Sequence, residues 1–379
     1  MRVAECEFRI EWLGALIVWW CNELRKSLIA GLAHWRTSPE WPLLVAGVGL
    51  LLSFIVHLTI YLLARGGIAF APTEWEGRIG WRKPILFAIS NAMVFTALAK
   101  ALRSQRLVPR LASAHAAAWG TVIEVSAITL QAWRGRASHF NTTTPLDATL
   151  YAIKLVGVST LGLVCLTTAA GCWMRPSMAA SASDRAALKF GLLLLSIAVI
   201  VGFVQVGYGH ILSSITDQRL ETEQACRRAT ANAHGAPCYE VYGEALLKIL
   251  HFVPLHSTEV LLFLSWAATR AKQAPAHRVA SVRLAAAGLA LLTAGSAWQV
   301  AHGGRLSLHG MARLDMDRPA ISAVLAGVVA VFSSFSLVVL SPLWTVGGST
   351  HLALQQGRGQ DRRCGARRAV ARNNEDACS

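Results

Sequence analysis

The sequence predicts an all-α integral membrane protein, a bundle of about eight transmembrane helices. Hydrophobic residues make up 54% of the 379 residues, charged residues only 15%, and the mean hydropathy is +0.44. Soluble globular proteins do not have this composition. Each segment in lipid has to pair its own backbone groups, and the alternating pattern of a membrane β-barrel is absent. The membrane segments are therefore expected to be helices.

Eight apolar segments are long enough to cross a bilayer, which takes about 20 predominantly apolar residues. They form one transmembrane domain over residues 41–346. The expected spans cover residues 42–64, 84–102, 111–133, 146–173, 188–212, 245–269, 282–302 and 319–346.

The two ends of the chain differ from this domain. Residues 1–40 contain an apolar patch at 13–21 that is too short to span, so an interfacial helix is expected there, or an extension of little consequence. Residues 347–379 are basic and show no apolar periodicity. This tail is expected to be disordered and to lie near anionic lipid headgroups in the cytoplasm.

The distribution of positive charge predicts how the chain crosses the membrane. The net charge is +15, and the positive residues sit mostly in short loops and the tail. That pattern orients membrane helices, and here it predicts a multi-pass protein of a bacterial inner membrane with both termini cytoplasmic. The basic loop at 65–83 weighs against this orientation. The bilayer is the expected partner, and nucleic acid is not.

The loop at 213–244 is expected on the outer side and contains Cys226 and Cys238. These two cysteines are candidates for a disulfide, because the outer side of the inner membrane is oxidising. Two unpaired thiols are the alternative. No pair of cysteines has the spacing of a structural zinc module.

Polar residues collect in the predicted outer half of the bundle. Glu124 lies inside an apolar segment, where an ionisable group is costly unless it faces other helices, water or a partner. Gln131 follows two helical turns later on nearly the same face. Arg134, His139 and Asn141 come next, in a short loop. The alternative is that this loop only anchors one helix and caps the next, with Thr144 or Asp147 as the N-cap.

The predicted sixth span is the richest in polar groups. His251, His256 and Glu259 fall within about 140° of one helix face, and Pro254 between the histidines is expected to kink the helix. A polar pocket open to the outer face is therefore expected as the site for a ligand or proton. Its expected lining is Glu124, Gln131, Arg134, His139, Asn141, His251, His256 and Glu259.

Three functions fit these residues. The first is proton-linked binding or transport of a small ligand or ion, with Glu124 and Glu259 carrying the proton. The second is a membrane oxidoreductase with a haem or metal cofactor, held by histidines at similar depth such as His57, His210 and His302. The third is a structural or assembly protein whose buried polar groups specify helix packing. The sequence identifies neither a substrate nor catalytic residues, and it leaves open whether the protein is an enzyme.

Three segments carry a resemblance to a protein group: WRKPILFAIS at 81–90, IEVSAITLQAWRGRASHFN at 123–141, and LKILHFVPLHSTEVL at 247–261. They resemble a group of uncharacterised multi-span bacterial inner-membrane proteins with a Gln-x-x-Arg-Gly-x-x-Ser-His-Phe-Asn motif. The resemblance covers about a third of the chain. It implies an inner-membrane location and a preferred site around these segments, and it implies no reaction.

Overall fold

The structure, a computed structural model, describes residues 15, 18–23, 25–26, 29, 38, 40–68, 81–104, 109–139, 141–174, 180–215, 244–301 and 319–338. All regular elements within these residues are helices. They are α2 (Glu40–Arg65), α3 (Arg82–Ser104), α4 (Arg110–Trp133), α5 (Pro145–Met174), α6 (Ala182–Ile215), α8 (Glu244–Leu255), α9 (Ser257–Arg270), α10 (Pro275–Ala301) and the helix Pro319–Val338.

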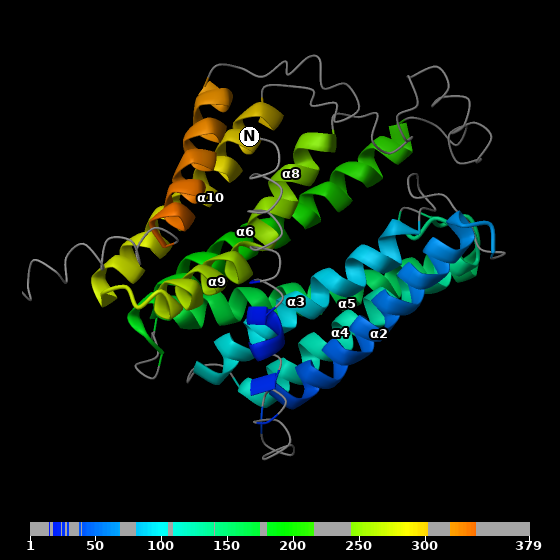
Figure 1. Cartoon of the computed structure of the whole chain (residues 1–379). Helices are drawn as coiled ribbons and strands as arrows, with labels where there is room; N and C mark the ends of the chain where they lie inside the picture. Colours follow the sequence, from blue (N-terminus) through cyan, green and yellow to red (C-terminus); the bar gives the residue numbers. More distant parts are fainter. Residues whose placement is uncertain are drawn as a thin grey trace, which may run out of the picture.

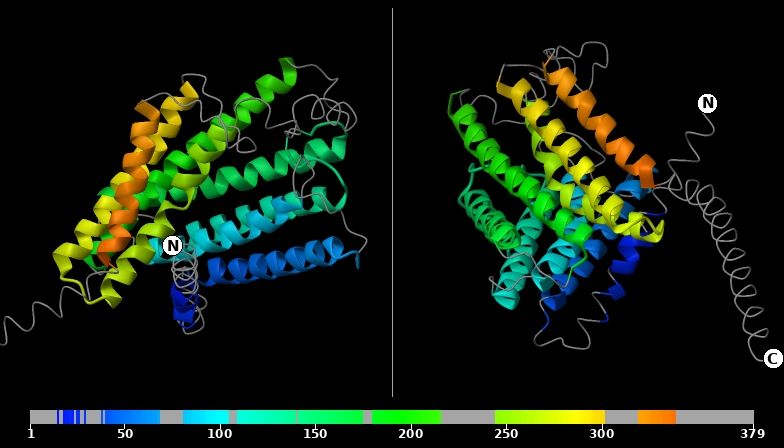
Figure 2. Two further views of the ribbon diagram at one scale, coloured as in Figure 1. Left: turned by 45° about the horizontal axis from the view of Figure 1, so that its top comes forward. Right: turned by 90° about the vertical axis from the view of Figure 1, so that its left-hand side faces the viewer.

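The helices form two groups (Figures 1 and 2). Helices α2 to α5 pack on one another, and α6, α8, α9 and α10 form the second group, with the helix Pro319–Val338 against α10. The groups meet where α5 packs on α6 and where α3 contacts α9. The contact between α3 and α9 matters for function, because it brings polar residues of the two groups together.

The prediction of an all-α membrane bundle is confirmed. Seven of the described helices are long and apolar enough to cross a bilayer. The predicted sixth span is formed by two shorter helices, α8 and α9, placed end to end around His256. Pro254 lies in the last turn of α8, where a proline removes a backbone N–H and disfavours continuation of the helix. The predicted kink is thus a break between two helices of 12 and 14 residues, and neither alone has the length of a membrane span.

Small residues let several helix pairs approach closely. Gly120 of α4 faces Gly157 of α5, and a Cβ built on Gly120 would lie 2.7 Å from the carbonyl oxygen of Gly157. Gly288 of α10 faces Gly327 in the same way, with 2.7 Å to its carbonyl oxygen. Helices in lipid associate mainly through such packing, because burial of apolar surface gives little driving force there.

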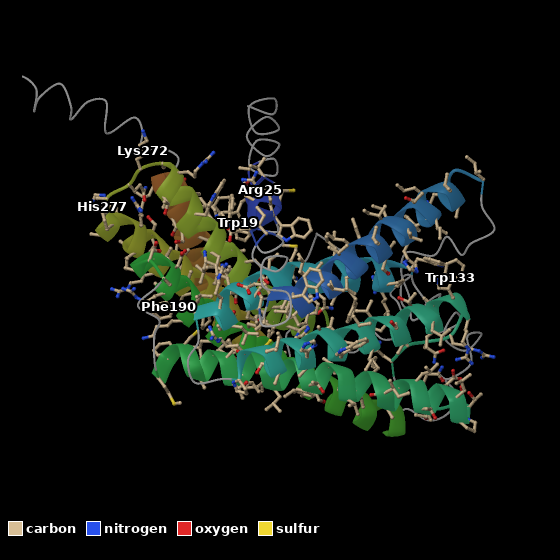
Figure 3. All side chains as sticks on the ribbon, turned by 90° about the horizontal axis from the view of Figure 1, so that it is seen from below. Trp19, Arg25, Trp133, Phe190, Lys272 and His277 are labelled. Carbon is tan, nitrogen blue, oxygen red and sulfur yellow. The ribbon has the colours of Figure 1, made fainter. Side chains whose placement is uncertain are left out.

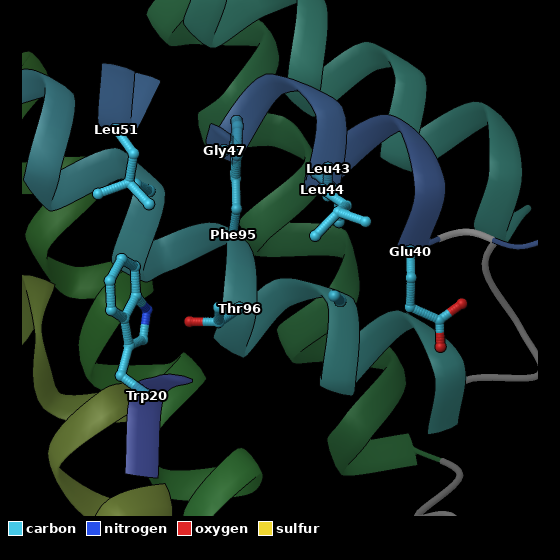
Figure 4. Close-up of a pocket in the computed structure, with 10 residues that line it drawn as sticks. Trp20, Glu40, Leu43, Leu44, Gly47, Leu51, Phe95 and Thr96 are labelled. Carbon is cyan, nitrogen blue, oxygen red and sulfur yellow. The ribbon is translucent and has the colours of Figure 1, made fainter. Parts of the chain in front are cut away.

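The described part of the N-terminal segment packs against the bundle. Trp19 is only 2% exposed, and its ring packs edge-on against the Phe263 ring of α9 with 5.7 Å between the ring centres. Trp20 closes one side of a small groove between α2 and α3 (Figure 4). The groove is lined by Trp20, Glu40, Leu43, Leu44, Gly47, Leu51, Ala92, Phe95, Thr96 and Ala99. Two predictions lie outside the described residues: the disordered tail at 347–379 and the candidate disulfide between Cys226 and Cys238.

Ion pairs join the helices at the α3 end near Ser104. Lys100 of α3 contacts Asp184 of α6 at 3.2 Å, and Ser265 of α9 donates a hydrogen bond of 2.7 Å to the same carboxylate. The Lys100–Asp184 pair, together with Ser265, therefore links the two helix groups by bridging α3, α6 and α9.

Figure 3 shows Trp133 at one end of the bundle and Lys272 with His277 at the other.

Candidate functional site

The loop between α4 and α5 is organised around the carboxylate of Asp147. This side chain is 0% exposed and accepts hydrogen bonds from Arg134 at 2.7 Å, Gln131 at 2.9 Å and Thr144 at 2.8 Å. Arg134 also donates to the Gln131 side-chain oxygen at 2.6 Å. A charged hydrogen-bond network of this kind is stronger than neutral bonds and fixes the geometry of its members.

The local sequence explains why Asp147 sits there. Thr144 is the N-cap of α5, because its hydroxyl accepts the backbone N–H of Asp147 at 3.1 Å. Pro145 occupies the first helical position, which proline favours. Of the two N-cap residues expected from the sequence, Thr144 fills the role. The side chain of Asp147, three residues after the cap, is thereby free to receive Arg134 and Gln131.

The remainder of the loop folds back toward α5. The Asn141 side chain donates to the carbonyl of Ala137 at 3.2 Å and accepts from the Thr143 hydroxyl at 2.8 Å. The Ser138 hydroxyl lies 2.9 Å from Nδ1 of His139. Gly135 has φ +63°, which allows the sharp turn at the end of α4. Arg134, His139 and Asn141 are thus held in one ordered loop.

Below this loop lie two oppositely charged side chains, Glu124 of α4 and Lys154 of α5. Glu124 is 5% exposed and Lys154 is 2% exposed. The Lys154 ammonium donates to the backbone carbonyl of Ser138 at 3.1 Å and lies 4.5 Å from the centre of the Tyr151 ring. Among the described residues, none donates a hydrogen bond to the Glu124 carboxylate, and the charge that acts on it is that of Lys154.

A second polar group lies at the break between α8 and α9. His256 sits between the two helices, and its Nε2 is 3.0 Å from the hydroxyl of Ser90 on α3. Its Nδ1 is 4.0 Å from the nearer oxygen of Glu259. Glu259 is 2% exposed, and among the residues that the structure describes neither of its buried carboxylate oxygens has a hydrogen-bond partner. His251 donates from Nδ1 to the carbonyl of Ala198 on α6 at 2.7 Å.

Helix α3 contacts both polar groups. The ring of Phe87 is 6.2 Å from that of His139 in the α4–α5 loop, and Ser90, one turn later, contacts His256. The eight residues expected to line one pocket thus occur as two sets beside α3. Glu124, Gln131, Arg134, His139 and Asn141 form the first set, and His251, His256 and Glu259 form the second. The groove of Figure 4 has a different lining, so the outer pocket stays a prediction.

The histidines expected to hold haem or metal have different settings. His57 donates from Nδ1 to the carbonyl of Ser53 at 2.6 Å and accepts at Nε2 from the indole N–H of Trp133 at 3.0 Å. The side chain of His210 and all of His302 lie outside the described residues. Within the described part, no three histidine, cysteine or acidic side chains are close enough to share a metal ion. A haem or metal cofactor stays a prediction.

Sequence reasoning missed two residues that the structure places in these groups. Asp147 was considered only as a possible cap, although Thr-Pro-x-Asp at a helix start is a signal for a side chain directed back at the loop. Ser90 had no signal at all, because a single serine in an apolar helix is common and its partner lies 166 residues away.

The fold and these two polar groups define an all-α polytopic membrane protein with ionisable residues inside the bundle. Comparisons with protein-family models, with curated proteins and with solved structures find no match to the chain. Its function has to be argued from the polar groups themselves.

Proposed function

We propose that the protein binds a small ligand or ion beside the α4–α5 loop and couples its binding or transport to a proton at Glu124. The observation that carries this proposal is the pair of Glu124 and Lys154, which are 5% and 2% exposed and lie on adjacent helices. Ionisable groups inside a membrane bundle are costly in free energy, and those that occur there commonly mark ion pathways and proton relays.

The chemistry of the pair suits proton coupling. A carboxylate and an ammonium attract each other inside the bundle, and moving one proton from lysine to glutamate turns two charged groups into two neutral ones. In a medium of low dielectric, these two states respond strongly to a nearby charge or a bound ligand. A ligand that contacts Lys154 or its partner carbonyl at Ser138 would therefore shift the proton.

The loop supplies groups that fit a small polar ligand. His139 and Ser138 lie above Lys154, and the Asn141 amide is fixed by Ala137 and Thr143. These groups include both donors and acceptors, and the Asp147 network holds the loop in place. Glu259 supplies a second buried carboxylate, in the first turn of α9. If the same charges only specified helix packing, proton movement would not depend on them.

Proton flux into vesicles tests this function. The purified full chain is reconstituted into lipid vesicles that enclose a pH indicator, and a pH step is imposed. We expect Glu124→Gln to lower the protein-dependent flux about 100-fold, in the range that a positioned acid or base contributes. The double variant Glu124→Gln, Lys154→Met removes both charges and is expected to recover stability without recovering flux.

Ser126→Ala is the matched control, because Ser126 lies on the exposed face of the same helix. It should leave the flux unchanged. A wild-type flux no greater than that of empty vesicles would contradict the proposal, and so would equal flux in the wild type and Glu124→Gln.

A further inference from the structure

Three side chains at the seam between the two helix groups have the order of a nucleophile, a base and an acid. The Ser90 hydroxyl is 3.0 Å from Nε2 of His256, and Nδ1 of His256 faces Glu259 at 4.0 Å. We infer that Ser90 is an activated nucleophile and that the protein carries an acyl-transfer activity on esters with an apolar chain. This activity is separate from the proton coupling assigned to Glu124.

The first support is the orientation of the imidazole ring. A general base has to lie within about 2.6–3.2 Å of the proton it removes, and the Ser90 hydroxyl meets that condition. Nε2 can accept this proton only when Nδ1 carries the other one, and the carboxylate of Glu259 opposite Nδ1 favours that tautomer. Such contacts are often long in the absence of substrate and shorten when substrate binds.

The second support is the state of Glu259. Within the described part of the chain, both of its oxygens are buried and have no hydrogen-bond partner, and the same holds for Nδ1 of His256. Unpaired polar atoms on two neighbouring buried side chains are costly for stability. When His256 becomes positively charged during a reaction, the Glu259 carboxylate faces the imidazolium and stabilises it.

The third support is the start of α9. His256 is the N-cap residue, and α9 begins at Ser257 without a side-chain cap. The first N–H groups of a helix have no acceptor within that helix, and its N-terminus favours negative charge. This end of α9 is therefore suited to stabilise both the Glu259 carboxylate and the oxyanion that forms when an ester carbonyl is attacked.

The surroundings of Ser90 indicate the class of substrate. The His256 side chain is 16% exposed, and Ser90 is also partly exposed. Phe252, whose ring is 5.1 Å from that of His256, is 62% exposed, and Leu86, one turn before Ser90, is 48% exposed. In a bundle surrounded by lipid, these exposed apolar side chains face acyl chains. A substrate would thus approach from the bilayer, as a lipid-like ester does.

The reaction balances without another cofactor. The Ser90 oxygen forms a bond to the acyl carbon and its proton passes to Nε2 of His256. The ester C–O bond then breaks, and the departing alcohol takes the proton from His256. Water next attacks the acyl group on Ser90, loses a proton to His256, and releases a carboxylic acid while Ser90 regains its proton. Water is the only co-reactant.

A fluorophosphonate probe with a long alkyl chain tests this inference on the purified full chain in lipid nanodiscs. Covalent reaction forms a bond between the serine oxygen and phosphorus and breaks the P–F bond, with fluoride and the serine proton leaving. We expect labelling of the folded wild type, and peptide mass spectrometry should place the adduct on Ser90. This mapping needs no variant, so it stands even if Ser90→Ala fails to fold.

Variants then test the roles of the neighbours. Ser90→Ala should remove the label, and His256→Gln and Glu259→Gln should each lower the labelling rate at least about tenfold. Ser159→Ala, at an exposed serine of α5, should label like the wild type. An unlabelled wild type, or an adduct on another residue, would overturn the inference.

Discussion

Gly157→Ala is expected to destabilise the bundle by about 3 kcal/mol, in the upper range for an overpacked core. A Cβ at this position overlaps the carbonyl oxygen of Gly120 and lies 3.2 Å from the backbone nitrogen and 3.3 Å from the Cβ of Glu124. Two of these three atoms belong to the backbone of α4, so relief requires the helices to separate. The separation would also displace Glu124 from Lys154.

The measurement is thermal unfolding in detergent, together with the yield of monodisperse protein. Gly49→Ala is the control, because a Cβ at Gly49 meets no atom within 4 Å. That change replaces a helical glycine by a better helix former and is expected to be neutral or to stabilise by about 0.5 kcal/mol. Equal unfolding temperatures for the two variants would show that α4 and α5 do not meet at these glycines.

Asp147→Ala is expected to cost about 3 kcal/mol, because it leaves Arg134 without its carboxylate and removes the acceptor of Gln131 and Thr144. The estimate lies at the low end of the range for breaking a buried ion pair. The reason is that the Arg134 side chain is 29% exposed and water compensates part of the loss.

Two companion variants make this measurement specific. Thr142→Ala changes an exposed residue of the same loop and should leave the unfolding temperature unchanged. Asp147→Asn keeps the shape and one acceptor oxygen, so an intermediate loss is expected. If Asp147→Ala unfolded at the same temperature as Thr142→Ala, the Asp147 network would not be what orders the loop.

The transmembrane architecture could be read from the sequence because apolar length and charge are local properties. The spans at 42–64 and 111–133 differ from α2 and α4 by no more than two residues at each end. The interruption of the helix near Pro254 could also be predicted, because proline lacks the backbone N–H that continues a helix. The extent of the break at His256 depends on packing against α3 and α6, which hydropathy does not describe.

The burial of two candidate site residues could be predicted from the sequence, but the spatial grouping of the candidates could not. Burial of Glu124 and Glu259 followed from the cost of exposing them to lipid, and both are buried. The contact of Ser90 with His256 depends on which faces of α3 and α9 meet, and small side chains at helix crossings decide that. In the structure these residues form two sets that both contact α3, and the outer pocket stays a prediction.

The hydrogen bonds of His57 could not be predicted from the sequence either. Its depth near Trp133 was compatible with a ligand role, but whether a histidine nitrogen is available depends on its neighbours. In the structure both nitrogens are used, by the Ser53 carbonyl and the Trp133 indole, and the ring lies 5.5 Å from that of Trp81. No spacing rule predicts a contact between a tryptophan at the end of α4 and a residue 76 positions earlier.

Infrared difference spectroscopy of the protein in lipid tests the central claim, that Glu124 takes up and releases a proton, most directly. As the pH is stepped down and up, a protonated carboxylic acid gains and loses its carbonyl-stretching band reversibly. We expect a reversible band that is present in the wild type and in Glu259→Gln, absent in Glu124→Gln, and shifted in its pH dependence in Lys154→Met. Identical spectra for the wild type and Glu124→Gln at every pH would contradict it.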